Sequence, residues 1–208
     1  MVVDNFKLIE DFMTFPNERS FYFVQILKRR KENPEMKAFS RQIECYYIFD
    51  KEQFERFKPH IIEKCQQNRA RAYIKLNVLD AQSVAYTNVT VIMQELRKQN
   101  WKALSSCFNM ACGQCGKQDG FEKLYLIDID NVKDIDVLKP YVDCVEECTP
   151  HNGVSKVKLI VPTLNGTHLI TTGFNLSEFK NKYKEVDIHE DGNTILYVPD
   201  LNKNEDEK

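Results

Sequence analysis

The order of strand and helix signals in the second half of the chain is the feature that most limits its fold. Short apolar or alternating runs predict strands, and longer runs with apolar residues three or four apart predict helices. By these signals the strands lie at 124–130, 157–161, 168–171 and 186–189, and the helices lie at 135–148 and 175–183. The second half therefore begins strand, helix, strand, strand, helix, strand, an order that few sheet arrangements satisfy.

The first half has a different order, and it opens with a hairpin. The predicted elements are strands at 21–27, 43–49 and 71–78 and helices at 51–67 and 81–99. Pro59 lies inside the first helix and predicts a split or a kink there. Asp80 is placed to cap the second helix. We expect this second helix to bury one stripe of apolar residues, namely Ala85, Val89, Ile92 and Leu96.

Together these orders predict an α+β protein. The β-α-β-β-α-β half has the ferredoxin-like order that RRM domains share, and a β-β-α-β-α half precedes it. We expect the first half to cover residues 1–120 and the RRM-like half to cover 121–199, with the polar residues 200–208 forming a disordered tail. The weak pattern at 101–120, which three glycines interrupt, predicts a connection between the halves.

The composition excludes several classes of protein. The chain has 208 residues, of which 42% are hydrophobic and 29% charged, as in ordinary globular domains. A net charge of -2 argues against the coating of nucleic acid by the whole surface, although a local basic patch is compatible with it. The N-terminus carries acids where a signal peptide has bases, and no run approaches the ~20 apolar residues of a membrane span. We therefore expect a cytoplasmic protein without a membrane partner.

Two aspartates end the apolar strand predicted at 124–130. Alternation places Asp128 and Asp130 on one face of this strand, with Ile127 and Ile129 on the opposite, buried face. Adjacent carboxylates repel each other, and a divalent cation between them removes that repulsion. An Asp-x-Asp pattern after an apolar run is not specific. Two interpretations therefore stay open: a metal site, or two polar residues that end the strand.

Further residues of the second half could complete a site with these aspartates. Asp187 and His189 share a face of the last predicted strand, which pairs beside the first strand in this order of elements. Asp187 could therefore be a third carboxylate, with Asp191 as a competing choice, or it could be an ordinary edge residue. His168 follows Gly166 at the start of a strand, where its imidazole could donate to a phosphate oxygen. We expect His168 to line one open face of a single sheet together with Asp128 and Asp130.

Basic residues in the first half suit a nucleotide and its phosphates. The residues 28–31, Lys-Arg-Arg-Lys, form a basic hairpin tip, and Arg69, Arg71 and Lys75 surround the start of the next strand. Alternation places Arg71 and Lys75 on one face with Tyr73, and basic groups alternating with an aromatic ring favour a stacked base. Solvated surface charges are the competing interpretation.

Two of the seven cysteines form a C-x-x-C pair, but zinc needs four ligands. Cys112 and Cys115 are predicted to lie in a loop, with too few partners nearby in the sequence. We therefore expect these thiols to be reduced and free of metal.

These elements resemble the signature elements of the archaeo-eukaryotic primase superfamily, the primase-polymerases. An apolar strand ending in Asp128 and Asp130, a small-x-His element formed by Gly166 and His168, and the acidic strand with Asp187 match its pattern. The stretch 160–171 is similar to segments of such proteins from phages and mobile elements, and the resemblance covers about 124–197.

The resemblance implies a metal-dependent nucleotidyltransferase that uses nucleoside triphosphates, a DNA or RNA template, and Mg²⁺ or Mn²⁺. It assigns Asp128, Asp130 and Asp187 as catalytic metal ligands and places His168 near the incoming triphosphate.

Two other classes of function compete with this interpretation. The first is a nucleic-acid-binding module on the same fold without catalysis. The second is a D-x-D glycosyltransferase, which requires an N-terminal nucleotide-binding α/β half, whereas this chain begins with a hairpin. An ordinary RRM is disfavoured because its aromatic pattern is absent and His168 lies where stacking aromatics are expected. Whether the protein is an enzyme, and its oligomeric state, stay open at this stage.

Overall fold

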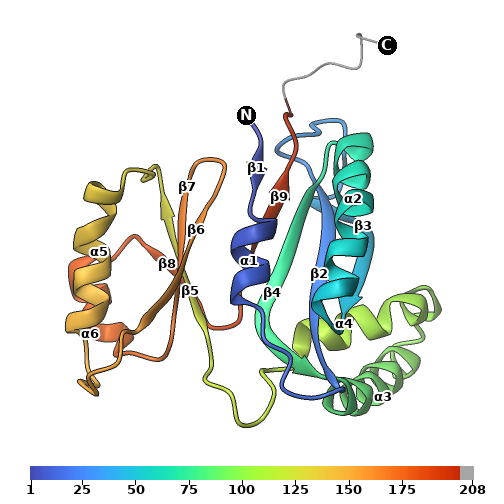
Figure 1. Cartoon of the computed structure of the whole chain (residues 1–208). Helices are drawn as coiled ribbons and strands as arrows, with labels where there is room; N and C mark the ends of the chain where they lie inside the picture. The colour runs from blue at the N-terminus through green and yellow to red at the C-terminus, as the bar shows by residue number, and fades with distance from the viewer. Residues whose placement is uncertain (202–208) are drawn as a thin grey trace.

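The computed structural model describes residues 1–201, which form an α+β fold with two antiparallel sheets (Figure 1). The five-stranded sheet has, in spatial order, β1 (Val3–Asp4), β9 (Asn193–Val198), β4 (Arg71–Asp80), β2 (Ser20–Arg29) and β3 (Ser40–Ile48). The four-stranded sheet has the order β6 (Val157–Pro162), β7 (Gly166–Thr171), β5 (Tyr125–Asp130) and β8 (Asp187–His189).

Helices flank both sheets. They are α1 (Phe6–Phe12), α2 (Lys51–Asn68), α3 (Ala81–Arg97), the 3₁₀ helix η1 (Trp101–Ser106), α4 (Cys107–Gln114), α5 (Ile135–Glu147) and α6 (Leu176–Lys182). Four of the helices begin at a polar side chain that accepts a hydrogen bond from a first-turn backbone N–H, namely at Asp50, Asp80, Asp134 and Asn175. Such caps satisfy donors that have no partner inside the helix.

Buried side chains hold the two sheets together. The largest core cluster joins α1, α2 and one face of the five-stranded sheet to Leu126, Val161 and Ile170 of the four-stranded sheet. A second cluster lies on the other face of the four-stranded sheet, where Ile127 and Ile129 pack with α5 and α6. The four-stranded sheet is therefore covered by helices on one side and by the larger sheet on the other, as Figure 1 shows.

The predicted order of elements is confirmed from β5 to β8, which run strand, helix, strand, strand, helix, strand. The order β2-β3-α2-β4-α3 in the first half is confirmed as well, but β1 and α1 precede it and were not predicted. Residues 101–120 are also more than a connection, since they contain η1 and α4. These segments are short, and their place in the fold does not follow from their own pattern.

The last strand crosses from one half to the other. We predicted that 121–199 would form one half, yet β9 pairs with β4 and β1 of the five-stranded sheet. A boundary near residue 120 therefore separates the two sheets except for β9. The predicted tail 200–208 lies outside the described residues from 202 onward, and Asp200 and Leu201 contact the N-terminus and Arg69.

One of the two alternatives predicted for α2, the split, is wrong, and so is the predicted apolar stripe of α3. Pro59 does not split α2, which is continuous, because buried Phe54 and Ile61 anchor the helix to the core on both sides of the proline. In α3 the buried face carries Val84 and Val91, whereas Val89 of the predicted stripe is 60% exposed. Apolar residues of α3 lie on more than one face of the helix, so its sequence pattern does not determine which face is buried.

Candidate functional site

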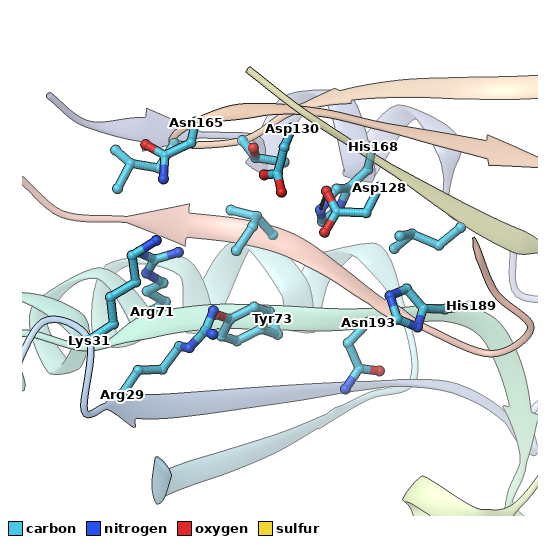
Figure 2. A pocket seen from close by; sticks show the side chains of 14 residues that line it. Arg29, Lys31, Arg71, Tyr73, Asp128, Asp130, Asn165, His168, His189 and Asn193 are labelled. Atoms are coloured by element: carbon cyan, nitrogen blue, oxygen red, sulfur yellow. Dashed lines mark hydrogen bonds and ion pairs between the residues drawn. The ribbon is translucent and has the colours of Figure 1, made fainter. Parts of the chain in front are cut away.

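A cleft of about 300 Å³ lies between the two sheets (Figure 2). The four-stranded sheet contributes Asp128, Asp130 and His168 to its lining, and the turn between β6 and β7 contributes Asn165. The strand period of two explains the aspartates, since Ile127 occupies the opposite face of β5 in the core with α5 and α6. Among the described residues, the cleft is lined by Arg29, Lys31, Arg71, Tyr73, Leu126, Asp128, Asp130, Thr163, Leu164, Asn165, His168, His189, Asn193 and Ile195.

His168 joins the acidic wall to the other sheet. It stands directly opposite Asp128 in the antiparallel pairing of β5 and β7, and its Nε2 lies 3.4 Å from Asp128 Oδ1. Its Nδ1 is 2.9 Å from Oγ1 of Thr194 on β9, within hydrogen-bond distance. The prediction that Asp128, Asp130 and His168 share one face is confirmed. That face is not open, however, because it looks onto the larger sheet, and His168 is only 8% exposed.

The surroundings of Asp128 favour its charged form. Hydrogen bonding from His168 lowers the pKa of Asp128, and the charges of His168, His189 and Arg29 act in the same direction against the opposing effect of burial. The Asp130 carboxylate is exposed, and within residues 1–201 it has no hydrogen-bond or ion-pair partner. The site thus offers two carboxylates on one strand face, and oxygen donors of this kind suit Mg²⁺ or Mn²⁺.

Cationic side chains form the opposite wall of the cleft. Figure 2 shows Arg29, Lys31 and Arg71 on the strand and hairpin side, facing the aspartates. Arg29 Nη1 donates to the Tyr73 hydroxyl at 3.2 Å. Arg71 is 7% exposed and forms an ion pair with Glu32 at 2.5 Å, while its buried Nε has no partner within the described chain.

Two predicted nucleotide-binding residues lie elsewhere. Arg69 ends α2 with a φ of 47°, and its guanidinium donates to Leu201 O, outside the cleft. Lys75 is 1% exposed, and its ammonium binds three carbonyl oxygens at the end of α4 as well as Asp191 Oδ2 at 2.6 Å. Alternation correctly puts Lys75 on the face of Tyr73, but the unpredicted α4 covers this part of the sheet.

The two candidates for a third acid have different surroundings. Asp187 stands opposite Asp128 in the pairing of β5 with β8, as predicted, but its exposed side chain does not line the cleft. Asp191 accepts from Lys75 and from Asn77 Nδ2 at 2.9 Å, so its carboxylate already has partners. Within residues 1–201 no group of three or more His, Cys, Asp or Glu side chains converges as a metal site.

Gly166 permits the close approach of β7 to the end of β5. A Cβ at this position would lie 2.1 Å from Ile129 O and 3.0 Å from Asp130 Cα. The turn before it is closed by a hydrogen bond from Gly166 N to Thr163 Oγ1 at 2.9 Å. The glycine therefore determines how tightly the strand with His168 packs on the strand with the aspartates.

The C-x-x-C pair does not lie in a loop. Cys112 is in the last turn of α4 and is fully buried, and Cys115 follows that helix. Burial raises the pKa of the Cys112 thiol to about 12, which disfavours the thiolate that zinc requires. Freedom from metal at these thiols stays a prediction.

Several residues of the site do not stand out in the sequence. Thr194, Glu32 and Asn193 were not predicted because their roles depend on tertiary contacts: Thr194 contacts His168 of the other sheet, Glu32 pairs with Arg71, and Asn193 lines the cleft. Arg29 and Lys31 were noted only as a basic tip, although Arg29 continues the alternating face of β2 that starts at Phe21. That alternation is the signal that could have placed Arg29 beside Tyr73.

The comparisons with protein-family models, with curated proteins and with solved structures give no match to this chain. Among residues 1–201, moreover, every helix is too short or too polar to cross a lipid bilayer.

Proposed function

We propose that the protein is a primase-polymerase-like nucleotidyltransferase, which joins nucleotides from nucleoside triphosphates on a DNA or RNA template with Mg²⁺ or Mn²⁺. The main support for this proposal is that the two walls of the cleft bear opposite charges. Asp128 and Asp130 lie on one wall, and Arg29 and Lys31 lie on the other. A metal-bound triphosphate needs carboxylates for its cation and cationic donors for its phosphates.

The topology supports the same proposal. The order β5-α5-β6-β7-α6-β8 supports an RRM-like half, and the two aspartates, the histidine and Asp187 come from its adjacent strands. The larger sheet is antiparallel throughout its described pairings, which argues against the parallel nucleotide-binding half that a D-x-D glycosyltransferase requires.

The residues of the chain have separate tasks in this proposal. Asp128 and Asp130 would hold the cation, and a cation bound there would supply activation of the attacking hydroxyl and neutralisation of charge on the leaving pyrophosphate. The lowered pKa of Asp128 keeps this carboxylate charged to a lower pH than an ordinary aspartate. Thr194 fixes the ring of His168 from its Nδ1 side, so that Nε2 is directed toward Asp128.

The basic wall binds the phosphates. Arg29 and Lys31 provide exposed or half-exposed cations, and Arg71 adds a buried guanidinium with one unpartnered N–H. A buried donor without a partner is costly, and a phosphate oxygen at this position would satisfy it. Asp187 remains the proposed third metal ligand, with Asp191 as its competitor.

Incorporation of a labelled nucleotide on a single-stranded template with Mn²⁺ tests this function. Asp128→Asn should abolish incorporation and the thermal stabilisation by Mn²⁺, because an amide does not replace a charged ligand. Asp119→Asn is the matched control, since Asp119 is exposed and lies outside the cleft. His168→Ala should weaken nucleotide binding but retain the response to Mn²⁺. Loss with Asp187→Asn but not with Asp191→Asn would identify the third acid.

A non-catalytic nucleic-acid-binding module is the second candidate. The observation in its favour is that, among residues 1–201, only two carboxylates line the cleft, while Asp191 is held by Lys75. Absence of incorporation by the parent protein, together with unchanged nucleic-acid binding in Asp128→Asn, would select this module.

A further inference from the structure

Positive charge is concentrated at the tip of the hairpin between β2 and β3. Residues 28–41 contain six basic and two acidic residues, in a chain whose net charge is -2. The two acids are already paired, Glu32 with Arg71 and Glu35 with Lys28 at 3.3 Å. The tip therefore presents an excess of cations that no carboxylate of the hairpin neutralises, and such a local excess attracts a polyanion.

An exposed aromatic ring stands within this basic region. Phe39 is 76% exposed, more than any of the other large apolar side chains exposed on the described surface. Its ring lies 5.7 Å from the guanidinium carbon of Arg29, which lines the cleft. An exposed ring beside a cation is the combination on which a nucleic-acid base can stack while its phosphate is bound.

Amide side chains continue this surface along the sheet toward the cleft. Gln42 on β3 accepts a hydrogen bond from Gln25 on β2 at 3.1 Å, and Asn193 on β9 donates to Gln25 at 3.2 Å. Asn193 lines the cleft. Primary amides carry both donors and acceptors, which suit the edges of unpaired bases.

We infer that Phe39, Arg29, Lys31, Gln42 and Gln25 form a strand-binding surface that guides single-stranded nucleic acid to the cleft. Phe39 stacks on a base, the cations bind phosphates, and the amides contact base edges. The inference rests on the proposed function in one respect, because the bound strand would serve as the template. An anionic lipid surface is disfavoured, since a bilayer does not follow a surface that leads into a concave cleft lined by polar groups.

Fluorescence anisotropy of a labelled oligothymidylate, titrated with the full chain without nucleotide or divalent cation, tests this surface. Phe39→Ala should weaken binding by about tenfold, the loss expected for one stacked base. Phe39→Trp should retain or improve the affinity. Tyr86→Ala is the matched control, because Tyr86 is an aromatic residue that is 67% exposed on α3 and lies outside the proposed strand-binding surface. Arg29→Gln should lower the slope of log affinity against log salt by about 0.7.

Three outcomes would overturn the inference: failure of the parent protein to bind the oligonucleotide, equal affinities of Phe39→Ala and Tyr86→Ala, or Phe39-dependent binding to phosphatidylserine vesicles in place of the oligonucleotide. Because the assay contains neither metal nor nucleotide, its result is separate from that of the incorporation assay. Strand binding that depends on Phe39 without incorporation would refute the proposed catalysis and leave this surface in place. Circular dichroism of each variant verifies that the fold is retained.

Discussion

Replacement of Gly166 by alanine should open the sheet at the candidate site. The added Cβ would lie 2.1 Å from Ile129 O, roughly 1 Å closer than the shortest ordinary carbon–oxygen contacts of about 3.3 Å. Its second neighbour is Asp130 Cα, at 3.0 Å. Both neighbours are backbone atoms of β5, so no side chain can rotate away, and the two strands must separate.

Separation of the strands should destabilise the fold as overpacking of a core does, and it also disturbs the hydrogen bonds between the strands. We expect Gly166→Ala to lower the free energy of unfolding by about 3 kcal/mol, and Tm by roughly 6–12 °C for a chain of this length. Gly166 stands opposite Asp130 in the pairing, so the displacement also moves this carboxylate relative to Asp128. Stabilisation by Mn²⁺ should therefore decrease along with Tm.

Urea denaturation of Gly166→Ala and two control variants measures this effect. A Cβ at Gly173 would meet only Tyr125 Cε2 at 3.8 Å, an ordinary contact, so Gly173→Ala should change stability by less than about 0.5 kcal/mol. Gly113 lies in α4 with no atom within 4 Å of an added Cβ, so Gly113→Ala should stabilise by about 0.5 kcal/mol. Equal stabilities of Gly166→Ala and Gly173→Ala would refute the reasoning.

Three further perturbations test other parts of the structure. Urea denaturation of Lys75→Met should show a loss of about 3 kcal/mol, because it breaks a buried ion pair, whereas Lys123→Met removes an exposed pair and should cost less than about 1 kcal/mol. By the same measurement Val84→Ala should cost about 2 kcal/mol and Val89→Ala less than about 0.5 kcal/mol. The pKa of Asp128 is lowered by hydrogen bonding from its neighbouring imidazole, so its contribution to stability is present above about pH 4 and is lost as pH falls through the lowered value. The difference in unfolding free energy between the parent and Asp128→Asn should accordingly shrink from pH 7 to pH 3, and a constant difference would contradict the assigned shift.

Local pattern was sufficient to predict the acidic wall. Alternation along β5 assigned Asp128 and Asp130 to one face, and the order of elements placed His168 and Asp187 on the strands that flank β5. The alternation of side chains along a strand and the pairing of elements that are neighbours in the sequence are local properties. Both can be predicted from a single sequence.

The basic wall depends on contacts that local pattern does not encode. Lys75 and Tyr73 share a face, yet α4 covers Lys75 and leaves Tyr73 in the cleft. Arg71 also lines the cleft, where it forms an ion pair with Glu32 of the hairpin between β2 and β3. Alternation predicts the face on which a side chain lies, but whether another element covers that face depends on tertiary packing.

The crossing of the chain from β8 to β9 connects the two walls. β8 pairs beside Asp128 in one sheet and β9 continues in the other, so the short turn between them limits how far the sheets can separate. Contacts reinforce this turn, since Asp191 binds Lys75 of β4, and Gly192 lies so close to His189 that a Cβ would meet its Cβ at 2.9 Å. His168 adds a second connection through Thr194. The width of the cleft therefore depends on contacts made by the segment 187–194, and a ligand that bridges the aspartates and the arginines must fit the spacing that this segment imposes.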